Sequence, residues 1–245
     1  MDRTRGLSRL LRTAAPYAWF LEDEVAGLAE FVGPGAVCLD VGAEYGLYTW
    51  TLAGLVGPTG HVHAVEPQPG PAALVGNTRR LTGADHVTLH RTALGAAPGA
   101  GTLSRPRRHL MPVHGRAFLT TGASGLGSNA EFEHHDDVPV EVTTVDDLVA
   151  RLDPVRLDLV KVDIEGAEAD LLTGARVTLA RFRPVLMLEL EDRHLARFGA
   201  TVAEVVTDLE LDGYTARTWH GRWVARRPDD ERRNVLFVPA ERNGS

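Results

Sequence analysis

Two glycines follow the first apolar segment of the chain, at a point where a strand would give way to a helix. The stretch VCLDVGAEYGLYTW (37–50) places Asp40 near the end of the apolar run and Gly42 and Gly46 after it. Glycine permits a tight turn and lets a ligand approach the backbone closely. The free N–H groups at the start of the following helix favour a carboxylate or a phosphate. This stretch therefore predicts part of a ligand-binding site.

Acidic residues lie at the ends of three later apolar segments, namely Glu66, Asp163 and Glu189. Ligands of an open parallel sheet bind at the carboxyl ends of its strands, so these acids are candidates for one shared site. Glu66 follows Gly42 by 24 residues. An acid at that distance is typical of residues that bind ribose hydroxyls.

The spacing of the glycines separates two classes of cofactor. The dinucleotide fingerprint G-x-G-x-x-G is absent, because three residues separate Gly42 from Gly46. This spacing argues against NAD and favours S-adenosylmethionine. A nicotinamide-dependent oxidoreductase on a similar fold remains the alternative enzyme.

Short apolar segments alternate with helical patterns, which indicates an α/β domain around a mostly parallel sheet. The candidate strands lie at 36–41, 61–66, 87–93, 157–163, 184–191, 214–219 and 234–240. The candidate helices lie at 47–56, 69–82, 166–182 and 201–212. No helix separates the last two strands, so the last strand is predicted to run antiparallel. We expect the helices to cover both faces of the sheet.

One stretch breaks this alternation. Residues 95–137 contain seven glycines and three prolines and show little periodicity. We predict an irregular insert that acts as a lid over the site. A short strand at 138–143 and a helix at 145–152 should follow, with the helix capped by Thr143 or Thr144.

Four motifs occur in a consistent order across residues 36–191: LDVGAEYGLYT, HAVEP, LVKVDIEGAEADLLTGA and PVLMLELE. Together with VEVTTVDDLV they resemble the FkbM family of S-adenosylmethionine-dependent methyltransferases. The resemblance implies a single methyltransferase domain over 1–245 with the Rossmann-like class I methyltransferase fold. It also implies transfer of a methyl group from S-adenosylmethionine to a hydroxyl oxygen of a small metabolite, such as a polyketide or a sugar.

The resemblance assigns roles to individual residues. Glu66 would bind both ribose hydroxyls, and Ala93 would lie beside the adenine. The Thr49 hydroxyl would reach the cofactor carboxylate, and Asp163 would face the methionine part. The complete set of implied cofactor-binding residues is Asp40, Gly42, Ala43, Gly46, Thr49, Glu66, Ala93 and Asp163.

Glu44 departs from the family pattern, in which Asn usually follows this Gly-Ala pair. An acid beside the cofactor carboxylate would repel it, unless Glu44 points to solvent or to the methionine ammonium. This residue makes a non-catalytic S-adenosylmethionine-binding protein a third hypothesis.

Methylation of a hydroxyl requires that its proton be removed by a base, or that a metal lower its pKa. Asp163 and Glu189 would end adjacent strands, so we predict that Asp163 is the base or orienter and that Glu189 assists it. Glu165 and His194 are further candidates. The Asp163–Glu189 pair could instead hold Mg²⁺. Two acids are too few for a dedicated site, so Mg²⁺ is possible but not expected.

The histidines of the insert carry less weight. His134 and His135 would point to opposite sides of an extended chain, which favours a solvated loop over a metal site. His109 and His114 could approach the acceptor as bases, but the sequence does not place them.

Composition narrows the partners and the compartment. The formal net charge of -7 argues against nucleic-acid binding, and the apolar runs are too short to span a membrane. Cys38, the single cysteine, is interpreted as a small buried hydrophobe in a reducing compartment. With no secretory signal recognisable, the protein is predicted to be cytoplasmic. The amphipathic helical segment at 1–33 suggests core packing or a homodimer contact, or else Tyr17 and Trp19 form a wall of the acceptor pocket.

Overall fold

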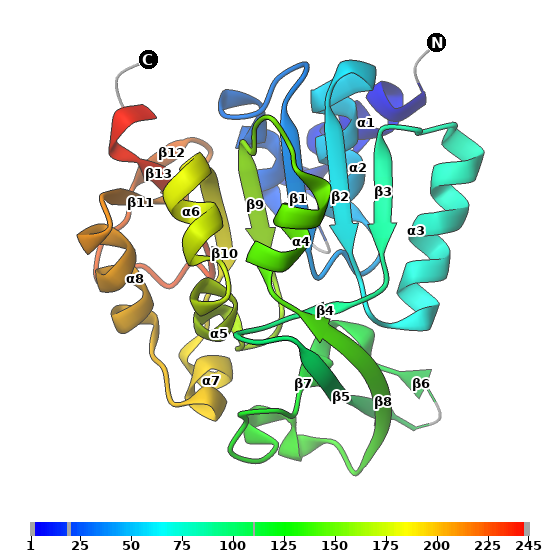
Figure 1. The fold of residues 1–245 in the computed structure, drawn as a ribbon, viewed down its shortest axis with the longest axis vertical. Helices are drawn as coiled ribbons and strands as arrows, with labels where there is room; N and C mark the ends of the chain where they lie inside the picture. The colour runs from blue at the N-terminus through cyan, green and yellow to red at the C-terminus, as the bar shows by residue number, and fades with distance from the viewer. Residues whose placement is uncertain (1–2, 19–20, 110, 243–245) are drawn as a thin grey trace.

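The main sheet has eight strands in the order β12-β11-β13-β10-β9-β1-β2-β3 (Figure 1). The structure is a computed structural model that describes residues 3–18, 21–109 and 111–242. The parallel strands are β1 (Val37–Val41), β2 (His61–Val65), β3 (Val87–His90), β9 (Leu159–Val162) and β10 (Val185–Glu189). The remaining strands are β11 (Tyr214–Trp219), β12 (Trp223–Ala225) and β13 (Asn234–Pro239).

The last strand runs antiparallel, as predicted from the missing helix before it. β13 pairs antiparallel with both β10 and β11. The short edge strand β12 was not predicted, because its three residues carry too little pattern. The fold is the Rossmann-like class I methyltransferase fold, with a mostly parallel sheet between two layers of helices.

Helices cover both faces of the sheet (Figure 1). One layer contains α1 (Arg3–Ala14), α2 (Leu47–Val56) and α3 (Pro69–Thr82). The other contains α4 (Val145–Leu152), α5 (Glu168–Thr173), α6 (Arg176–Phe182) and α8 (Val202–Leu211). The short helix α7 (Asp192–Leu195) follows β10. Both faces of the parallel strands are therefore buried, which explains their nearly continuous apolar sequences.

The helix predicted at 166–182 is instead two helices, α5 and α6. Gly174 lies between them, and a Cβ atom at this position would clash with the carbonyl oxygen of Gly95. The Gly174 carbonyl accepts a hydrogen bond from the Asp146 N–H at 2.9 Å. The close approach of these segments ends the first helix. Thr144 is the N-cap of α4 and accepts the Asp147 N–H at 2.9 Å, which decides between the two predicted caps.

The prediction of an irregular insert at 95–137 was wrong. This part of the chain builds most of a second sheet, ordered β4-β8-β5-β6, in which β7 also pairs with β5. Its strands are β4 (Ala93–Leu94), β5 (Gly99–Arg108), β6 (Met111–Pro112), β7 (Phe118–Leu119) and β8 (His134–Thr143). Leu103, Leu119 and Val142 pack together in a small core of its own. The pairing of β5 with a distant strand compensates for its glycines and its proline.

The small sheet lies beyond the carboxyl ends of the parallel strands (Figure 1). The predicted strand 87–93 ends at His90, and Ala93 belongs to the small sheet, where it pairs with Val142. The chain thus passes directly from the edge of the main sheet into the small one. This connection places the small sheet over the region where a ligand is expected.

The N-terminal segment packs on the main domain. In α1, the Ser8 hydroxyl donates to the Thr51 carbonyl of α2 at 2.8 Å. A 3₁₀ helix, Asp23–Glu30, follows and contributes buried residues to the same core. Tyr17 is exposed and does not line the cavity described below, whereas Trp19 lies outside the described residues. Within the described ranges, no helix is long and apolar enough to cross a membrane.

Candidate active site

A cavity of about 290 Å³ lies between the carboxyl ends of the parallel strands and the small sheet. Gly42, Glu66, Asp163 and Glu189 line it from the main sheet. Residues 114–119 line it from the small-sheet segment. The structure therefore brings most of the predicted acids to one place, as expected for strand ends in a parallel sheet.

The two glycines of the first motif are required by close neighbours. Gly42 has φ +77°, and a Cβ atom there would clash with the carbonyl oxygen of Asp163. Gly46 has φ +89°, and its Cβ atom would clash with the indole of Trp50. Gly42 lines the cavity, whereas Gly46 and Ala43 do not. The turn therefore lets β1 and β9 end side by side, which brings Asp163 to the cavity.

Asp40 and Thr49 form a buried pair beneath this turn. The Thr49 hydroxyl donates to a carboxylate oxygen of Asp40, and neither residue lines the cavity. Burial raises the pKa of Asp40 to about 6, although the Thr49 hydrogen bond and the Lys161 ammonium oppose the shift. The pair therefore stabilises the turn without reaching the cavity itself.

Glu66 is buried and held by two backbone donors. Its oxygens accept the Glu44 N–H at 2.9 Å and the Gln68 N–H at 2.7 Å. Each carboxylate oxygen has two lone pairs, so acceptor capacity remains on both for a diol. Burial raises the pKa of Glu66 to about 7. With Gly42 beside it, this acid fits the ribose of an adenosine cofactor.

Glu44, the departure from the family pattern, faces the cavity. Its backbone is left-handed, with φ +42°, and its carboxylate lies against Gly115 of the opposite wall. Burial raises the pKa of Glu44 to about 7, helped by the charges of Asp163 and Glu66. Its place in this wall suits the positive groups of a sulfonium amino acid better than a carboxylate.

Asp163 and Glu189 end the adjacent strands β9 and β10 and both line the cavity. Burial opposes ionisation of Asp163, but the Lys161 ammonium at 3.4 Å and a hydrogen bond from Glu189 outweigh it and lower the pKa of Asp163. Burial, together with the Asp163 charge, raises the pKa of Glu189 to about 10. Arg233, 3.0 Å from Glu189, opposes this shift without reversing it, so the pair favours a charged Asp163 and a protonated Glu189.

Glu22, which lines the cavity, and Lys161, which contacts Asp163, were not predicted to belong to the site. Lys161 is buried, with its ammonium 4.6 Å from the centre of the Tyr48 ring. The Tyr48 hydroxyl donates to Glu22, which also accepts the Asn234 side-chain amide at 3.1 Å. The only lysine of the chain, placed inside an apolar strand, was the available signal. Nothing local marked Glu22, which comes from the N-terminal segment.

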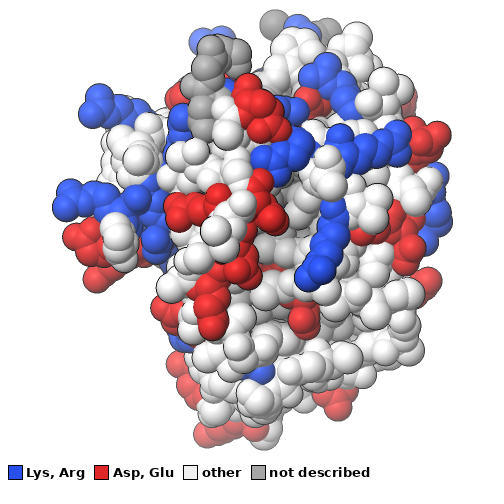
Figure 2. Space-filling model, turned by 60° about the vertical axis from the view of Figure 1, so that its left-hand side comes forward, with Lys and Arg blue, Asp and Glu red and all other residues white. Residues whose placement is uncertain are grey.

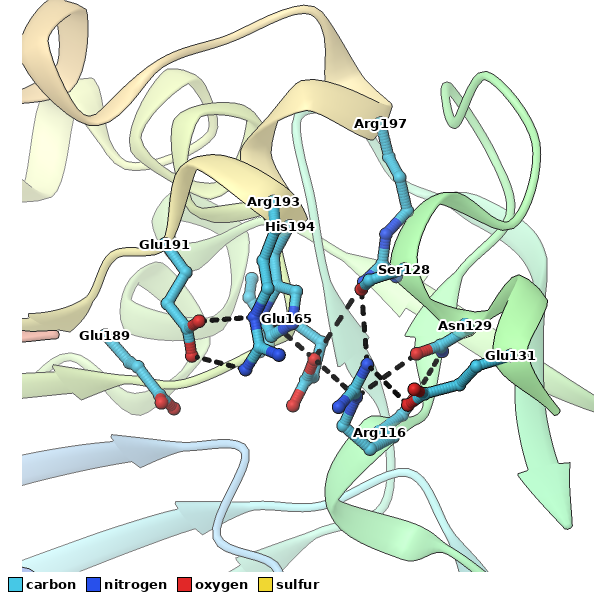
Figure 3. A network of polar contacts seen from close by, with 12 residues as sticks. Arg116, Ser128, Asn129, Glu131, Glu165, Glu189, Glu191, Arg193, His194 and Arg197 are labelled. Atoms are coloured by element: carbon cyan, nitrogen blue, oxygen red, sulfur yellow. Dashed lines mark hydrogen bonds and ion pairs between the residues drawn. The ribbon is translucent and has the colours of Figure 1, made fainter. Parts of the chain in front are cut away.

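A network of arginines and acids lies between the α7 region and the small-sheet segment (Figure 3). Glu165 is at its centre, with an oxygen 3.1 Å from His194 Nδ1, 3.9 Å from Arg116 Nε and 4.0 Å from Arg197 Nη2. Burial raises the pKa of Glu165 to about 8, against the opposing charges of Arg116 and Arg197. Glu165 and His194, predicted only as further candidates, both line the cavity.

The histidines of the insert lie in different environments. His114 lines the cavity, and its Nδ1 lies 2.7 Å from the Gln68 side-chain oxygen. His135 lies on β8 and contacts the Ser104 hydroxyl at 3.1 Å. Neither His134 nor His109 lines the cavity. Across the part of the chain that the structure describes, no group of three or more His, Cys, Asp or Glu could hold a metal ion.

Comparison with known proteins agrees with this architecture. A family model described as Methyltransferase FkbM domain matches residues 40–216. The AMB antimetabolite synthetase AmbE of Pseudomonas aeruginosa is 30% identical over 236 residues, which cover 84% of this chain but only 11% of the synthetase.

Two solved structures match this chain at low sequence identity. The crystal structure of methyltransferase FkbM from Methylobacillus flagellatus KT matches with a TM-score of 0.49 and 20% identity, covering 83% of this chain and 43% of that one. Cofactor-bound Rv0187 from MTB matches with a TM-score of 0.50 and 15% identity, covering 98% and 91%. Since the family model spans more than half of the sequence, the chain belongs to the FkbM family of S-adenosylmethionine-dependent methyltransferases.

Proposed function

We propose that this protein transfers a methyl group from S-adenosylmethionine to a hydroxyl oxygen of a small metabolite. The observation that carries this proposal is the Asp163–Glu189 pair, which lines the same cavity as Glu66 and Gly42. A hydroxyl acceptor needs a base to remove its proton, and a carboxylate next to it provides that base. A more nucleophilic acceptor would not need one.

The cofactor would be held along the carboxyl ends of β1, β2 and β9. Glu66 would accept the ribose hydroxyls, and Ala93 would lie beside the adenine. Glu44 and Asp163 would face the positively charged methionine part. When bound, S-adenosylmethionine supplies a methyl group on a positively charged sulfur that serves as the leaving group. The family is one of methyltransferases, which argues against the nicotinamide-dependent alternative.

Asp163 would act as the base. It is kept charged by Lys161, and the protonated Glu189 orients it through a hydrogen bond. The acceptor hydroxyl gives its proton to Asp163 as its oxygen forms the new bond to carbon. The products are an ether, a neutral thioether and a protonated Asp163, so charge is conserved.

The small sheet would exclude water from this reaction and hold the acceptor in line. Gln68 and His114 connect it to the cofactor side through the 2.7 Å contact, and Gln68 Nε2 also donates to the His114 carbonyl at 3.1 Å. The folded small sheet, in place of an irregular insert, would act as the lid over the site.

The nature of the acceptor has support from two sides. A cavity of about 290 Å³ suits a small molecule. The related AmbE is named for the synthesis of an antimetabolite.

Figure 2 shows acidic and basic side chains side by side on one face, with no broad basic patch of the kind that nucleic acids require.

Calorimetry with S-adenosylmethionine, S-adenosylhomocysteine and NAD tests the cofactor, and a panel of hydroxylated metabolites tests the reaction. We expect the two sulfur ligands to bind, Glu66→Ala to lose them, and NAD to be inert. Asp163→Asn should keep S-adenosylhomocysteine binding and lose about a hundredfold or more in kcat, the usual effect of removing a base. Full turnover in Asp163→Asn would refute the base, and tight binding without turnover across the panel would favour a non-catalytic binding protein.

A further inference from the structure

Three positively charged side chains form part of the cavity lining, namely Arg116, Arg193 and Arg233. Figure 3 shows Arg116 and Arg193 on either side of Glu165, with Arg197 above them. Their positive charge would repel the sulfonium of the proposed cofactor, so we assign these arginines to the methyl acceptor.

The arginines around Glu165 have more positive charge than that residue can neutralise. Arg193 and Arg233 have a carboxylate partner in Glu191. Arg116 and Arg197 instead share Glu165, at 3.9 and 4.0 Å, distances too long for hydrogen bonds.

Arg116 also has Glu131 at 3.6 Å, but the Glu131 side chain is 58% exposed and its charge is screened by solvent. Glu165 is therefore the one buried carboxylate within ion-pair distance of both arginines among the described residues.

The guanidinium of Arg197 lacks hydrogen-bond partners among the described residues. Its side chain is 1% exposed, and none of its three guanidinium nitrogens has a hydrogen-bond partner among the described residues. Its flat face lies over the Phe118 ring at 4.1 Å, and Phe118 lines the cavity. The Glu165 oxygen between the two arginines is likewise buried without a hydrogen bond. A buried polar group without a partner is costly, so an arrangement that supplies one is favoured.

Arg116 is held in place before any ligand arrives. Its Nε donates to the Asn129 side-chain oxygen at 3.1 Å, and its Nη2 donates to the Ser128 hydroxyl at 3.2 Å. Asn129 is fully buried and donates back to the Arg116 carbonyl at 2.7 Å. A guanidinium positioned in this way loses little entropy when it binds a planar anion.

We propose that the part of the cavity lined by Arg116 and Arg193 binds a carboxylate group of the methyl acceptor, with Arg116 in contact with it. The inference rests on the proposed methyl transfer, because it names the class of acceptor: a hydroxy acid or a larger metabolite with a free carboxylate. With the ligand on Arg116, Glu165 is released to complete its hydrogen bonds to Arg197 and His194. Both unsatisfied groups then gain a partner.

The test uses the full chain saturated with S-adenosylhomocysteine, so that no turnover occurs. Lactate, 3-hydroxybutyrate and 4-hydroxybenzoate are each compared with their methyl esters by calorimetry. We expect at least one acid to bind about tenfold or more tightly than its ester, since the ester lacks the charged hydrogen bond. No preference for the acids, including no binding by either series, overturns the proposal.

Arg116→Gln should remove the preference, and Arg108→Gln is the matched control. Both arginines lie over the Phe132 ring, at 5.8 and 5.9 Å, but only Arg116 lines the cavity. If Arg116→Gln does not fold, Arg116→Lys keeps the charge but loses the planar fork, and should weaken the preference. A preference that survives in Arg116→Gln, or persists undiminished in Arg116→Lys, contradicts the proposal.

Binding of S-adenosylhomocysteine is measured first in every variant. Its absence in the wild type would refute the proposed function. Its presence together with no preference for acids would refute only the acceptor class.

Discussion

Gly42 lies in the turn after β1, where its backbone contacts the end of β9 that carries Asp163. Its left-handed backbone and the carbonyl of Asp163 leave no room for a side chain. Gly42→Ala should therefore lower the melting temperature and weaken S-adenosylhomocysteine binding, because the end of β9 must move.

Gly83 supplies the comparison for this substitution. It has φ +68°, but nothing lies within 4 Å of an added Cβ atom. Gly83→Ala should cost only the backbone strain, about 1 kcal/mol, and leave binding intact. Equal losses in the two variants, measured by urea unfolding and calorimetry, would contradict the role given to Gly42.

Glu44 should make cofactor affinity depend on pH. Its pKa is raised to about 7 by burial, so it gains its charge as the pH rises through neutrality. S-adenosylmethionine has a sulfonium charge that S-adenosylhomocysteine lacks. We expect the preference for S-adenosylmethionine to grow as the pH rises from about 6 to about 8.

Glu44→Gln should flatten this dependence, because the amide does not ionise. Calorimetry of both ligands across the pH series checks the prediction. An unchanged slope in Glu44→Gln would assign the effect to another group, such as Glu66.

At the scale of elements, α8 shows how a local sequence fixes one end of a helix. Thr201 accepts the Glu204 N–H at 3.2 Å, and Glu204 accepts the Thr201 N–H at 2.9 Å, which completes a capping box. Thr201→Ala should lower the free energy of unfolding by about 1 kcal/mol. Thr207→Ala, at an exposed position inside the same helix, should be neutral or slightly stabilising. Urea unfolding of both variants measures the difference, and equal effects would argue against the cap.

Only one strand of the small sheet was predicted from its own residues: the strand expected at 138–143 is part of β8. β5 contains glycines and a proline and pairs with β8 in an antiparallel register from Gly99–Val142 to Arg107–His134. Cross-strand contacts such as Arg105–Asp136, at 2.8 Å, form only after the intervening chain has closed. The β-propensity of a sequence is a property of one strand, whereas pairing of this kind stabilises two strands together.

At the scale of the whole molecule, buried glutamates lower the stability at high pH and buried histidines lower it at low pH. Burial raises the pKa of Glu66 and Glu168 to about 7 and that of Glu189 to about 10, from 4.5. The unfolded chain releases these protons first, so the free energy of unfolding falls as the pH rises above 4.5. Burial lowers the pKa of His63 to about 3 and of His194 to about 4, from 6.5. The unfolded histidines bind protons first, so stability also falls as the pH drops below 6.5.

The unliganded protein should therefore be most stable between these limits. We expect the free energy of unfolding, measured in urea, to be higher at about pH 5.5 than at about pH 8.5. Glu168→Gln keeps an acceptor oxygen for the Ile164 and Gly166 N–H groups and should reduce the loss at high pH. Stability that rises steadily from pH 5.5 to 8.5 would contradict the protonated state of these glutamates.

The sequence by itself determined the main sheet, the turn at Gly42 and the edge at which the acids meet. These features follow from short apolar runs and from the rule that parallel strands end at one edge, so local pattern was sufficient. The acids at Glu66, Asp163 and Glu189 reach the cavity for this reason.

Only the tertiary structure decided which charges these residues carry and what faces them. Glu189 keeps its proton because it is buried beside Asp163, and Asp163 loses its proton because Lys161 lies 3.4 Å away. The wall opposite them comes from the small sheet, and the arginine network joins segments more than 60 residues apart, such as Arg116 and Arg197. Burial and long-range pairing arise from the whole chain, and no local window of sequence contains them.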